Sequence, residues 1–255
     1  MLRSAAFAAA SLVTLALAQA APNPPANVTA AVSDSARPEA DTKRDANRKP
    51  TDMLVFAQVR SGEKVVDLLP GGGYFTRLFS VAVGPTGKVY ALAPAKPADA
   101  PADAPDRAGA VRGIAADPHY GNVVVVAQPA RELLLLKLPE PVDLVWTSQN
   151  YHDVHNVKDF DLATFNKAVF AALKPGGLYI VLDHAATPGS GAQDTATLHR
   201  IDEATVKQEV EAAGFKLVGE SKVLANPADP HTAKVFDPSI QGHTDQFILK
   251  FQRPK

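Results

Sequence analysis

Short apolar runs rich in β-branched residues alternate along the chain with segments whose apolar positions recur at helical spacing. The runs predict strands over residues 64–69, 88–92, 122–127, 142–146, 178–183, 215–218 and 247–251. Continuous apolar strands separated by helices are typical of a mostly parallel sheet that is covered on both faces. The sequence therefore predicts an α/β fold, in which ligands bind beyond the carboxyl ends of the strands.

The helical segments are bounded by residues that start or stop helices. We expect amphipathic helices over 74–83 and 160–173, the second stopped by the Lys-Pro-Gly-Gly sequence that follows it. Another helix begins after Asp202, a good N-cap, and ends at Gly214. A short amphipathic stretch over 51–59 predicts a helix just before the first strand.

The N-terminal residues carry a different pattern. Arg3, an apolar run over 5–18 and the sequence Ala18-Gln19-Ala20 match a secretory signal, so we expect residues 1–20 to be a signal peptide cleaved near Ala20. The run is shorter than the roughly 20 apolar residues that span a bilayer, which argues against stable membrane insertion. We therefore expect a periplasmic or secreted protein.

Two further segments precede the first strand. Residues 21–40 are rich in Pro, Ala, Asn and Ser without an apolar period, which predicts a disordered leader. The folded domain is then expected over 41–255. Its first ten residues are densely charged; we expect a solvated face there, with the alternative that it lies over a ligand pocket.

Composition narrows the possible chemistry. The 255 residues include 26 Lys+Arg and 27 Asp+Glu, giving a formal net charge of -1, with 46% hydrophobic residues. This balance is typical of a soluble globular protein and argues against a dedicated nucleic-acid binder. The absence of Cys excludes disulfides, a thiolate zinc site and a thiol nucleophile.

A glycine-rich turn follows the first predicted strand and leads directly into a helix. Glycines there allow close approach of a ligand to the backbone, and the free amides of a helix start favour an anionic group. With an acid at its head, the turn indicates a nucleotide-like ligand. The candidate binding residues in it are Asp67, Pro70, Gly71, Gly72, Gly73 and Tyr74.

Three sequence blocks together resemble the class I S-adenosylmethionine-dependent methyltransferases: VVDLLPGGGYFTRLF at 65–79, VDLVW at 142–146 and LKPGGLYIVLD at 173–183. Their order also fits that superfamily, and the chain is similar to a group of exported, predicted methyltransferases without an assigned substrate. The resemblance implies a Rossmann-like, doubly wound sheet of seven strands with an antiparallel last strand. It further implies S-adenosylmethionine as cofactor, with the glycine turn holding the amino-acid end of this methyl donor.

The sequence departs from that pattern at two positions. Leu69 stands where the first glycine of the turn is usual, and the second strand ends in Leu92-Ala93 without the acid that binds the ribose hydroxyls in such enzymes. Losing two charge-assisted hydrogen bonds weakens the hold on a nucleoside.

The polar block after the strand over 142–146 corresponds to the position that lies beside the donor's methyl group in related enzymes. Within it, His152 or Tyr151 is a candidate general base, and Asp153 or Asp183 can orient an imidazole. Asn150 is a candidate for binding the donor or the acceptor. His184, directly after the next strand, should lie on the same rim.

Two alternatives use the same region. His152 and His155 are spaced i, i+3, so a metal site completed by Asp153 or His184 is one of them. The other is a periplasmic ligand- or metal-binding protein that kept the fold and lost the donor. The favoured prediction is an exported methyltransferase that acts on a small molecule, with residues 226–246 as a long connection suited to a lid.

Overall fold

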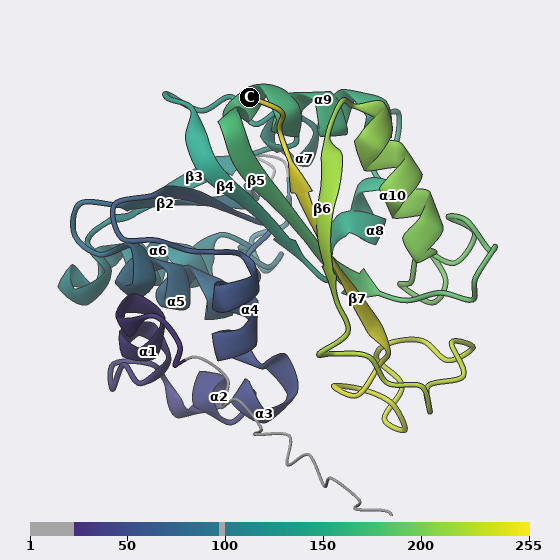
Figure 1. The fold of residues 1–255 in the computed structure, drawn as a ribbon, viewed down its shortest axis with the longest axis horizontal. Coiled ribbons are helices and arrows are strands. Elements are labelled where there is room, and N and C mark those ends of the chain that lie inside the picture. The colour runs from purple at the N-terminus through teal and green to yellow at the C-terminus, as the bar shows by residue number, and fades with distance from the viewer. Residues whose placement is uncertain (1–22, 97–99) are drawn as a thin grey trace, which may run out of the picture.

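Seven strands form one sheet in the order β3-β2-β1-β4-β5-β7-β6 (Figure 1). The computed structural model describes residues 23–96 and 100–255, so the expected signal peptide over 1–20 lies outside the described residues. The strands are β1 (Lys64–Leu68), β2 (Lys88–Pro94), β3 (Val123–Gln128), β4 (Val142–Ser148), β5 (Leu173–His184), β6 (Lys216–Ser221) and β7 (Gln246–Gln252).

Strand directions agree with the expected architecture. The five strands from β3 to β5 run parallel, whereas β7 is antiparallel to both of its neighbours, β5 and β6. The prediction of a mostly parallel, Rossmann-like α/β sheet with an antiparallel last strand is confirmed. The chain moves outward from β1 through β2 to β3 and then returns to β4, so the strand order reverses between β1 and β4. Ligands bind at this reversal in open α/β sheets.

Helices cover both faces of the sheet, as Figure 1 shows. One face carries α1 (Ala26–Val32), α4 (Pro50–Phe56), α5 (Tyr74–Val83) and α6 (Gly109–Ala116), followed by the short turn η1 (Pro118–Tyr120). The other face carries α7 (Ala130–Leu133), α8 (Tyr151–Val154), α9 (Leu162–Ala172) and α10 (Glu203–Ala212). Each face has its own apolar core, because inward side chains of the strands alternate between the two layers.

Most predicted elements match the structure closely. The helix expected over 74–83 is α5 itself, and Asp202 caps α10 by accepting a hydrogen bond from the backbone of Ala204. The Lys-Pro-Gly-Gly sequence does stop α9, but it also starts β5, five residues earlier than predicted. There the backbone N–H of Gly176 donates to the carbonyl of Arg253 at 2.9 Å.

The predicted disordered leader over 21–40 is wrong for the described residues from 23 onward. Helix α1 packs against α5, and its Val28 and Ala31 are fully buried in the core. The side chain of Asn27 donates to the carbonyls of Val59 and Ala82 at 3.0 and 3.1 Å. The apolar stripe of α1 is short and partly alanine, so its composition resembles that of a linker. Val28 and Val32, with Ala31, are nevertheless enough to pack the helix against the core.

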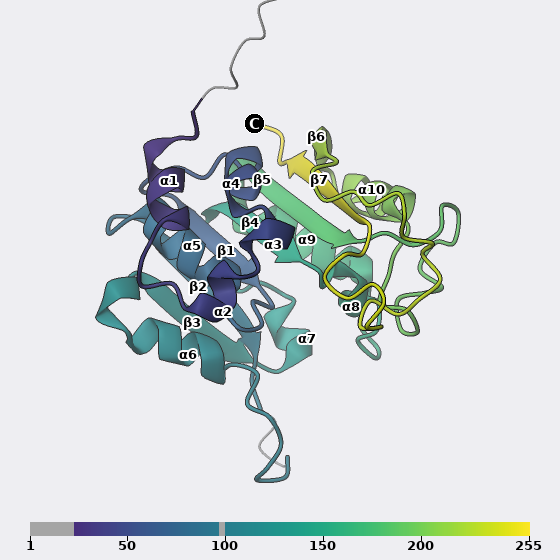
Figure 2. The same ribbon diagram turned by 90° about the horizontal axis from the view of Figure 1, so that it is seen from below.

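The charged segment after it is also folded. It forms α2 (Glu39–Thr42) and α3 (Asp45–Arg48), and Figure 2 shows both helices beside the strand ends of the sheet. Arg37, buried before α2, pairs with Asp45 at 2.6 Å, and Asp41 pairs with Arg77 of α5 at 2.9 Å. These pairs tie the N-terminal helices to the start of α5. The ordered unit thus begins before residue 41.

The long connections beyond β5 are held by a buried arginine. Arg200, fully buried, donates to the carbonyls of Ala185 and Ala233 at 2.9 and 3.0 Å and pairs with the buried Asp229 at 2.9 Å. This fixes the segment before α10 against the loop between β6 and β7. Within 23–96 and 100–255, no helix combines the length and the apolar character required to cross a membrane.

Val28→Ala tests whether α1 is part of the core. We expect the free energy of unfolding to fall by about 2 kcal/mol, because the lost methyl groups leave a cavity between α1 and α5. Chemical denaturation of the two proteins measures this difference. The exposed Thr29 provides the matched control, since Thr29→Ala changes the same helix outside the core. Equal stability of Val28→Ala and the unmodified chain would show that α1 does not pack there.

Candidate active site

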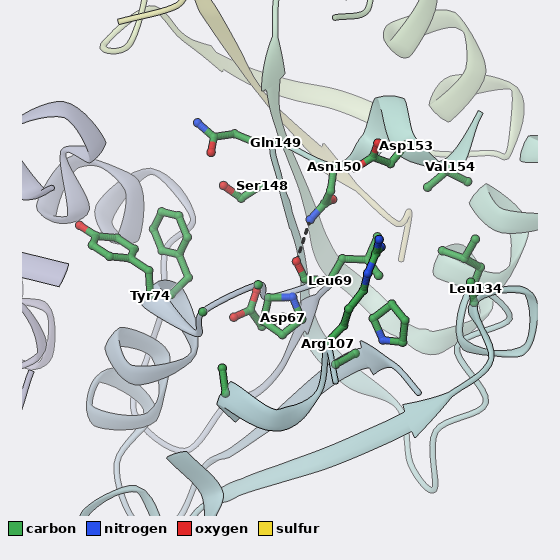
Figure 3. Close-up of a pocket in the computed structure, with 18 of the residues that line it drawn as sticks. Asp67, Leu69, Tyr74, Arg107, Leu134, Ser148, Gln149, Asn150, Asp153 and Val154 are labelled. Atoms are coloured by element: carbon green, nitrogen blue, oxygen red, sulfur yellow. Dashed lines mark hydrogen bonds between the residues drawn. The ribbon is translucent and has the colours of Figure 1, made fainter. Parts of the chain in front are cut away.

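A cavity of about 710 Å³ opens at the carboxyl ends of β1, β2 and β4, beside the reversal in strand order (Figure 3). Its wall combines the glycine turn, the end of β4 and side chains from α2–α3 and α7. This volume lies within the range of pockets that enclose nucleotide-sized ligands. The sequence predicts ligand binding at this same edge of the sheet, beyond the carboxyl ends of the strands.

The glycine turn divides into two parts with different roles. Gly71 and Gly72 line the cavity, and a Cβ atom built on either would have no atom within 4 Å. Gly73 does not line it; a Cβ there would lie 2.1 Å from Cδ1 of Ile114, and its φ of 79° starts α5. The first two glycines therefore leave an open cradle, whereas Gly73 is required for packing against α6.

Leu69 adopts the backbone conformation of the glycine that it replaces. Its φ is 53°, in the left-handed region that non-glycine residues rarely adopt. Its N–H donates to the carbonyl of Leu92 at 2.9 Å, which ties the turn to β2. Leu69 and the following Pro70 both line the cavity. Leucine at this position thus carries local backbone strain that a glycine would not have.

Asp67 is the acid at the head of the turn. It is buried near the end of β1 and lines the cavity, where it accepts a hydrogen bond from Oγ1 of Thr76 at 2.6 Å. Burial raises the pKa of Asp67 to about 7, although the bond from Thr76 and the charge of Arg48 both oppose this rise. Asp67 can therefore change its charge near neutral pH.

Arg48 lines the cavity, although it belongs to none of the sequence motifs. Its guanidinium stacks over the rings of Tyr74 and Phe75, at 4.8 and 5.3 Å from their centroids, and donates to Oε1 of Gln149 at 2.6 Å. In the described part of the chain no carboxylate lies within ion-pair distance of it. Burial, with the neighbouring Arg44, lowers its pKa to about 10, so it remains a cation at neutral pH.

Three cations and two acids thus line the cavity among the residues described. Arg107 joins Arg44 and Arg48, and the acids are Asp67 and Asp153. The alternative in which the charged N-terminal segment lies over a ligand pocket is therefore the one found. Tyr74 supplies its ring to the wall, while its hydroxyl donates to Asp45 at 2.7 Å.

Asn150 lines the cavity directly beside the start of the glycine turn (Figure 3). Its Nδ2 donates to the carbonyls of Leu68 and Leu69 at 2.9 and 3.3 Å, which fixes the side chain against the end of β1. Its Oδ1 is buried and has no hydrogen-bond partner in the described structure, and neither has Oγ of the adjacent Ser148. Buried polar atoms without partners are rare, and both of these atoms belong to residues that line the cavity.

Gln149 joins three distant parts of the chain at the same edge. Its backbone has a φ of 60°, and its side chain accepts from Arg48 and donates through Nε2 to Oε1 of Gln246 at 3.0 Å. It therefore connects the N-terminal helices, the end of β4 and the start of β7. No motif in the sequence indicated this role.

Tyr151, predicted as a possible base, is buried in the opposite core. Its hydroxyl donates to Glu209 at 3.0 Å and accepts from Asn166 at 2.9 Å. Burial raises its pKa well above the usual value, and its ring packs near Phe165. The prediction of Tyr151 as a base is therefore wrong, because α8 buries its ring and hydroxyl in the core away from the cavity.

His152 and Asp183 form a buried pair behind the cavity wall. Nδ1 of His152 lies 2.8 Å from Oδ1 of Asp183, whose other oxygen accepts the backbone N–H of His152, also at 2.8 Å. Burial would lower the pKa of His152, but the charge and hydrogen bond of Asp183, with Asp153, raise it overall. The expected orientation of the imidazole by an acid is present, with Asp183 on Nδ1.

The far side of the same ring meets two further polar groups. Nε2 of His152 lies 3.4 Å from Oδ1 of Asp153, which lies 3.7 Å from Nδ1 of His199. Asp153 also lines the cavity, so this cluster borders it. His199 could not be found from local spacing, because it reaches the cluster from the segment before α10.

The other predicted histidines lie elsewhere. Nδ1 of His184 is 2.7 Å from the hydroxyl of Thr244, and burial lowers the pKa of His184 to about 4, against the pull of Asp183. His184 is on the expected rim but outside the cavity lining. Nε2 of His155 is 3.2 Å from Glu209, so His155 does not join His152 as the i, i+3 spacing suggested.

The end of β2 carries no acid, in agreement with the sequence. Ala93 and Pro94 line the cavity there, near the apolar side chains of Ala130 and Leu134. This part of the cavity is suited to a flat, weakly polar group.

No family model matches this chain. The chain is 29% identical over 203 residues to the ubiquinone/menaquinone biosynthesis C-methyltransferase UbiE of Saccharophagus degradans, an alignment that covers 77% of this chain and 67% of that protein.

Solved structures share the fold at low sequence identity. A methyltransferase from Aquifex aeolicus, described as SAM dependent, superposes with a TM-score of 0.55 and 16% identity, over 82% of this chain and 98% of that one. The arsenic(III) S-adenosylmethionine methyltransferase of Chlamydomonas reinhardtii gives the same score and identity over 91% and 75% of the two chains. The [4+2]-cyclase SpnF is also similar, with a TM-score of 0.54, 16% identity, and coverage of 84% and 81%.

These findings agree with the sheet order and with the glycine turn that leads from β1 into α5. The chain has the fold of the class I S-adenosylmethionine-dependent methyltransferases, and its sequence is similar to that of a C-methyltransferase.

Proposed function

We propose that this protein transfers a methyl group from S-adenosylmethionine to a small-molecule acceptor. The observation that carries the proposal is the open cradle at Gly71 and Gly72, in a cavity that Asp67 and Asn150 also line. The similarity to a C-methyltransferase supports the same reaction class. The alternative of a binding protein that lost the donor is not favoured, because the cradle is intact.

The residues present fit the charged end of the donor. Its carboxylate is matched by the free amides of the glycine turn and by Arg48, a buried cation without a carboxylate partner among the described residues. Its ammonium group is matched by Asp67, and Asn150 lines the same cavity. Opposite charges thus face the two ends of an amino-acid group.

The remaining wall of the cavity fits a nucleoside, although it lacks the acid at the end of β2 that usually binds the ribose. Leu134, Val154 and Val157 offer an apolar surface for the adenine ring. At the end of β2, Ala93 and Pro94 provide no carboxylate for the ribose, and Arg107 is the nearby polar group that lines the cavity. The proposal therefore includes weaker binding of the ribose than in enzymes that carry the acid.

The donor, when bound, supplies a methyl group on a positively charged sulfur that a nucleophile can attack. The chain's own residues then act mainly by alignment, which lowers the entropic barrier. The glycine turn and Asn150 would position the donor, while Asp153 and the His152–Asp183 pair border the side from which an acceptor can approach.

Direct titration tests donor binding. Isothermal titration of the chain with S-adenosylmethionine and with its demethylated product should show competitive binding at one site. Gly72→Val should weaken binding at least tenfold, because the new side chain occupies the cradle. Its unfolding midpoint should stay unchanged, since no atom lies within 4 Å of a Cβ there.

Gly113→Val is the matched control. Gly113 lies in α6 with the same free space around a built Cβ and does not line the cavity, so its affinity should equal that of the unmodified chain. No heat and no competition at millimolar ligand would contradict the proposal.

The titration of Asp67 predicts that the affinity for the donor depends on pH. A carboxyl with a pKa of about 7 is mostly protonated at pH 5.5 and half ionised at pH 7, while the donor's ammonium stays charged. Affinity for the donor should therefore rise about tenfold from pH 5.5 to pH 7. Asp67→Asn should bind more weakly at pH 7 and show a flat profile over this range. A profile equally steep in Asp67→Asn would exclude Asp67 as the cause.

We also propose that the protein acts outside the cytoplasm, on the basis of the signal-like residues 1–20. Expression of the full chain in a Gram-negative bacterium should yield periplasmic protein whose mass corresponds to a start at Ala21. Leu15→Arg interrupts the apolar run and should leave the uncleaved chain in the cytoplasm. An intact N-terminus in the unmodified chain would contradict export by cleavage.

A further inference from the structure

The cluster of His152, Asp153 and His199 lies beside the cavity and is not required to hold the donor. One ligand-type atom from each residue lies within 4.8 Å of the other two. Two edges of this triangle measure 3.4 and 3.7 Å. In a tetrahedral site with metal–ligand bonds of 2.0–2.1 Å, ligand atoms stand about 3.3–3.4 Å apart. The three side chains are thus close to the spacing that a metal ion requires.

Asp183 prepares His152 for this role. It is fully buried and accepts from the backbone N–H groups of His152 and His184, both at 2.8 Å, so its position is fixed. With the proton of a neutral imidazole held on Nδ1 by Asp183, the lone pair of Nε2 points toward Asp153. A histidine whose other nitrogen is held by a carboxylate is the usual arrangement in metal sites.

This orientation places two acceptors face to face. The lone pair of Nε2 and a carboxylate oxygen of Asp153 lie 3.4 Å apart, a repulsive contact unless a cation lies between them. A proton or a metal ion can supply that charge. The third group, His199, favours a metal, because a proton needs only two of the three atoms.

His199 is held rigidly enough to serve as a ligand. The neighbouring Arg200 is buried and bonded to Ala185 and Asp229, which anchors the backbone beside the cluster. The ring of His199 lies between those of His152 and Phe236, at centroid distances of 5.5 and 5.0 Å. Phe236, which is 61% exposed, belongs to the loop between β6 and β7 and packs against the His199 side of the cluster.

We propose that His152, Asp153 and His199 bind a divalent transition-metal ion through two imidazoles and one carboxylate. Three protein ligands leave at least one position open, as in catalytic rather than structural metal sites. Because Asp153 also lines the donor cavity, the open position borders it. An oxygen-containing acceptor can bind there.

The consequence for the acceptor rests on the proposed methyl transfer. A hydroxyl that binds the metal loses its proton to solvent more easily. The resulting oxygen donates an electron pair to the methyl carbon; the new O–CH₃ bond forms as the S–CH₃ bond breaks, and sulfur keeps the electron pair. The acceptor class is thus a small molecule with an acidic hydroxyl group, such as a phenol or an enol.

Metal binding is tested without donor, on tag-free full-length protein. Titration with Zn²⁺ should give one equivalent of binding, and Co²⁺ should produce the visible absorption of a low-coordinate site. His199→Gln and Asp153→Asn should each weaken Zn²⁺ binding at least tenfold and remove the Co²⁺ bands. Both side chains are partly exposed, so these variants are expected to fold, which circular dichroism checks.

Two control variants make the test specific. His119 is an exposed histidine paired with Asp34 at 3.0 Å, and His119→Gln should bind metal like the unmodified chain. His155→Gln removes the i, i+3 neighbour of His152 and should also have no effect. No stoichiometric Zn²⁺ or Co²⁺ binding, or equal losses in the controls, would overturn the proposal, as would a proton found on Nε2 of His152 by NMR in the presence of excess metal.

The outcomes also separate this site from the proposed function. A chain that binds metal at these residues but no S-adenosylmethionine supports the metal site and contradicts methyl transfer. A chain that binds S-adenosylmethionine but no metal contradicts the metal site and leaves the proposed methyl transfer standing.

Discussion

The fully buried carboxylate of Asp183 determines how the end of β5 meets the segment after β4. It accepts from the imidazole of His152 and from two backbone N–H groups, all at 2.8 Å. Burial would raise its pKa, but the charge and hydrogen bonds of His152 hold it below its usual value, so it stays ionised. An unpaired charge in this position would be costly, which makes the pairing with His152 nearly obligatory.

This pairing fixes the direction of helix α8. With His152 held inward to Asp183, Tyr151 packs into the core, Asn150 reaches the end of β1, and Asp153 lies at the cavity. One four-residue helix therefore supplies a core residue, an oriented imidazole and a cavity acid. The polar block was recognisable in the sequence, but its division among these roles was not.

Whether an element could be predicted from the sequence depends on whether its pattern of apolar residues is long enough to identify it. Strands and long helices followed from apolar periodicity, and α5 matches its predicted range because the glycine turn marks its start and Gly84 its end. Helix α1 was missed because its buried stripe is only Val28 and Ala31 with Val32 beside them, a pattern too short to separate from a linker. The charged segment that contains Arg48 was placed over a ligand pocket only as an alternative, and His199 was not predicted. Both residues reach the site by long-range packing, which local spacing does not encode.

The low identity of the structural neighbours limits what the fold alone assigns. At 16% identity, methyltransferases and a cyclase share this architecture, so the chemistry has to be argued from the cavity. Two features make the lining of this cavity more positive. The end of β2 has no acid, and Arg44 and Arg48 reach the cavity from the N-terminal segment.

The side chain of Gln149 has a consequence for the order in which the site is assembled. Its partners Arg48 and Gln246 lie 101 and 97 residues away, in opposite directions along the chain. A growing polypeptide that has not yet reached β7 lacks Gln246. The hydrogen bonds of Gln149, which lines the cavity, are therefore complete only when the last strand has entered the sheet.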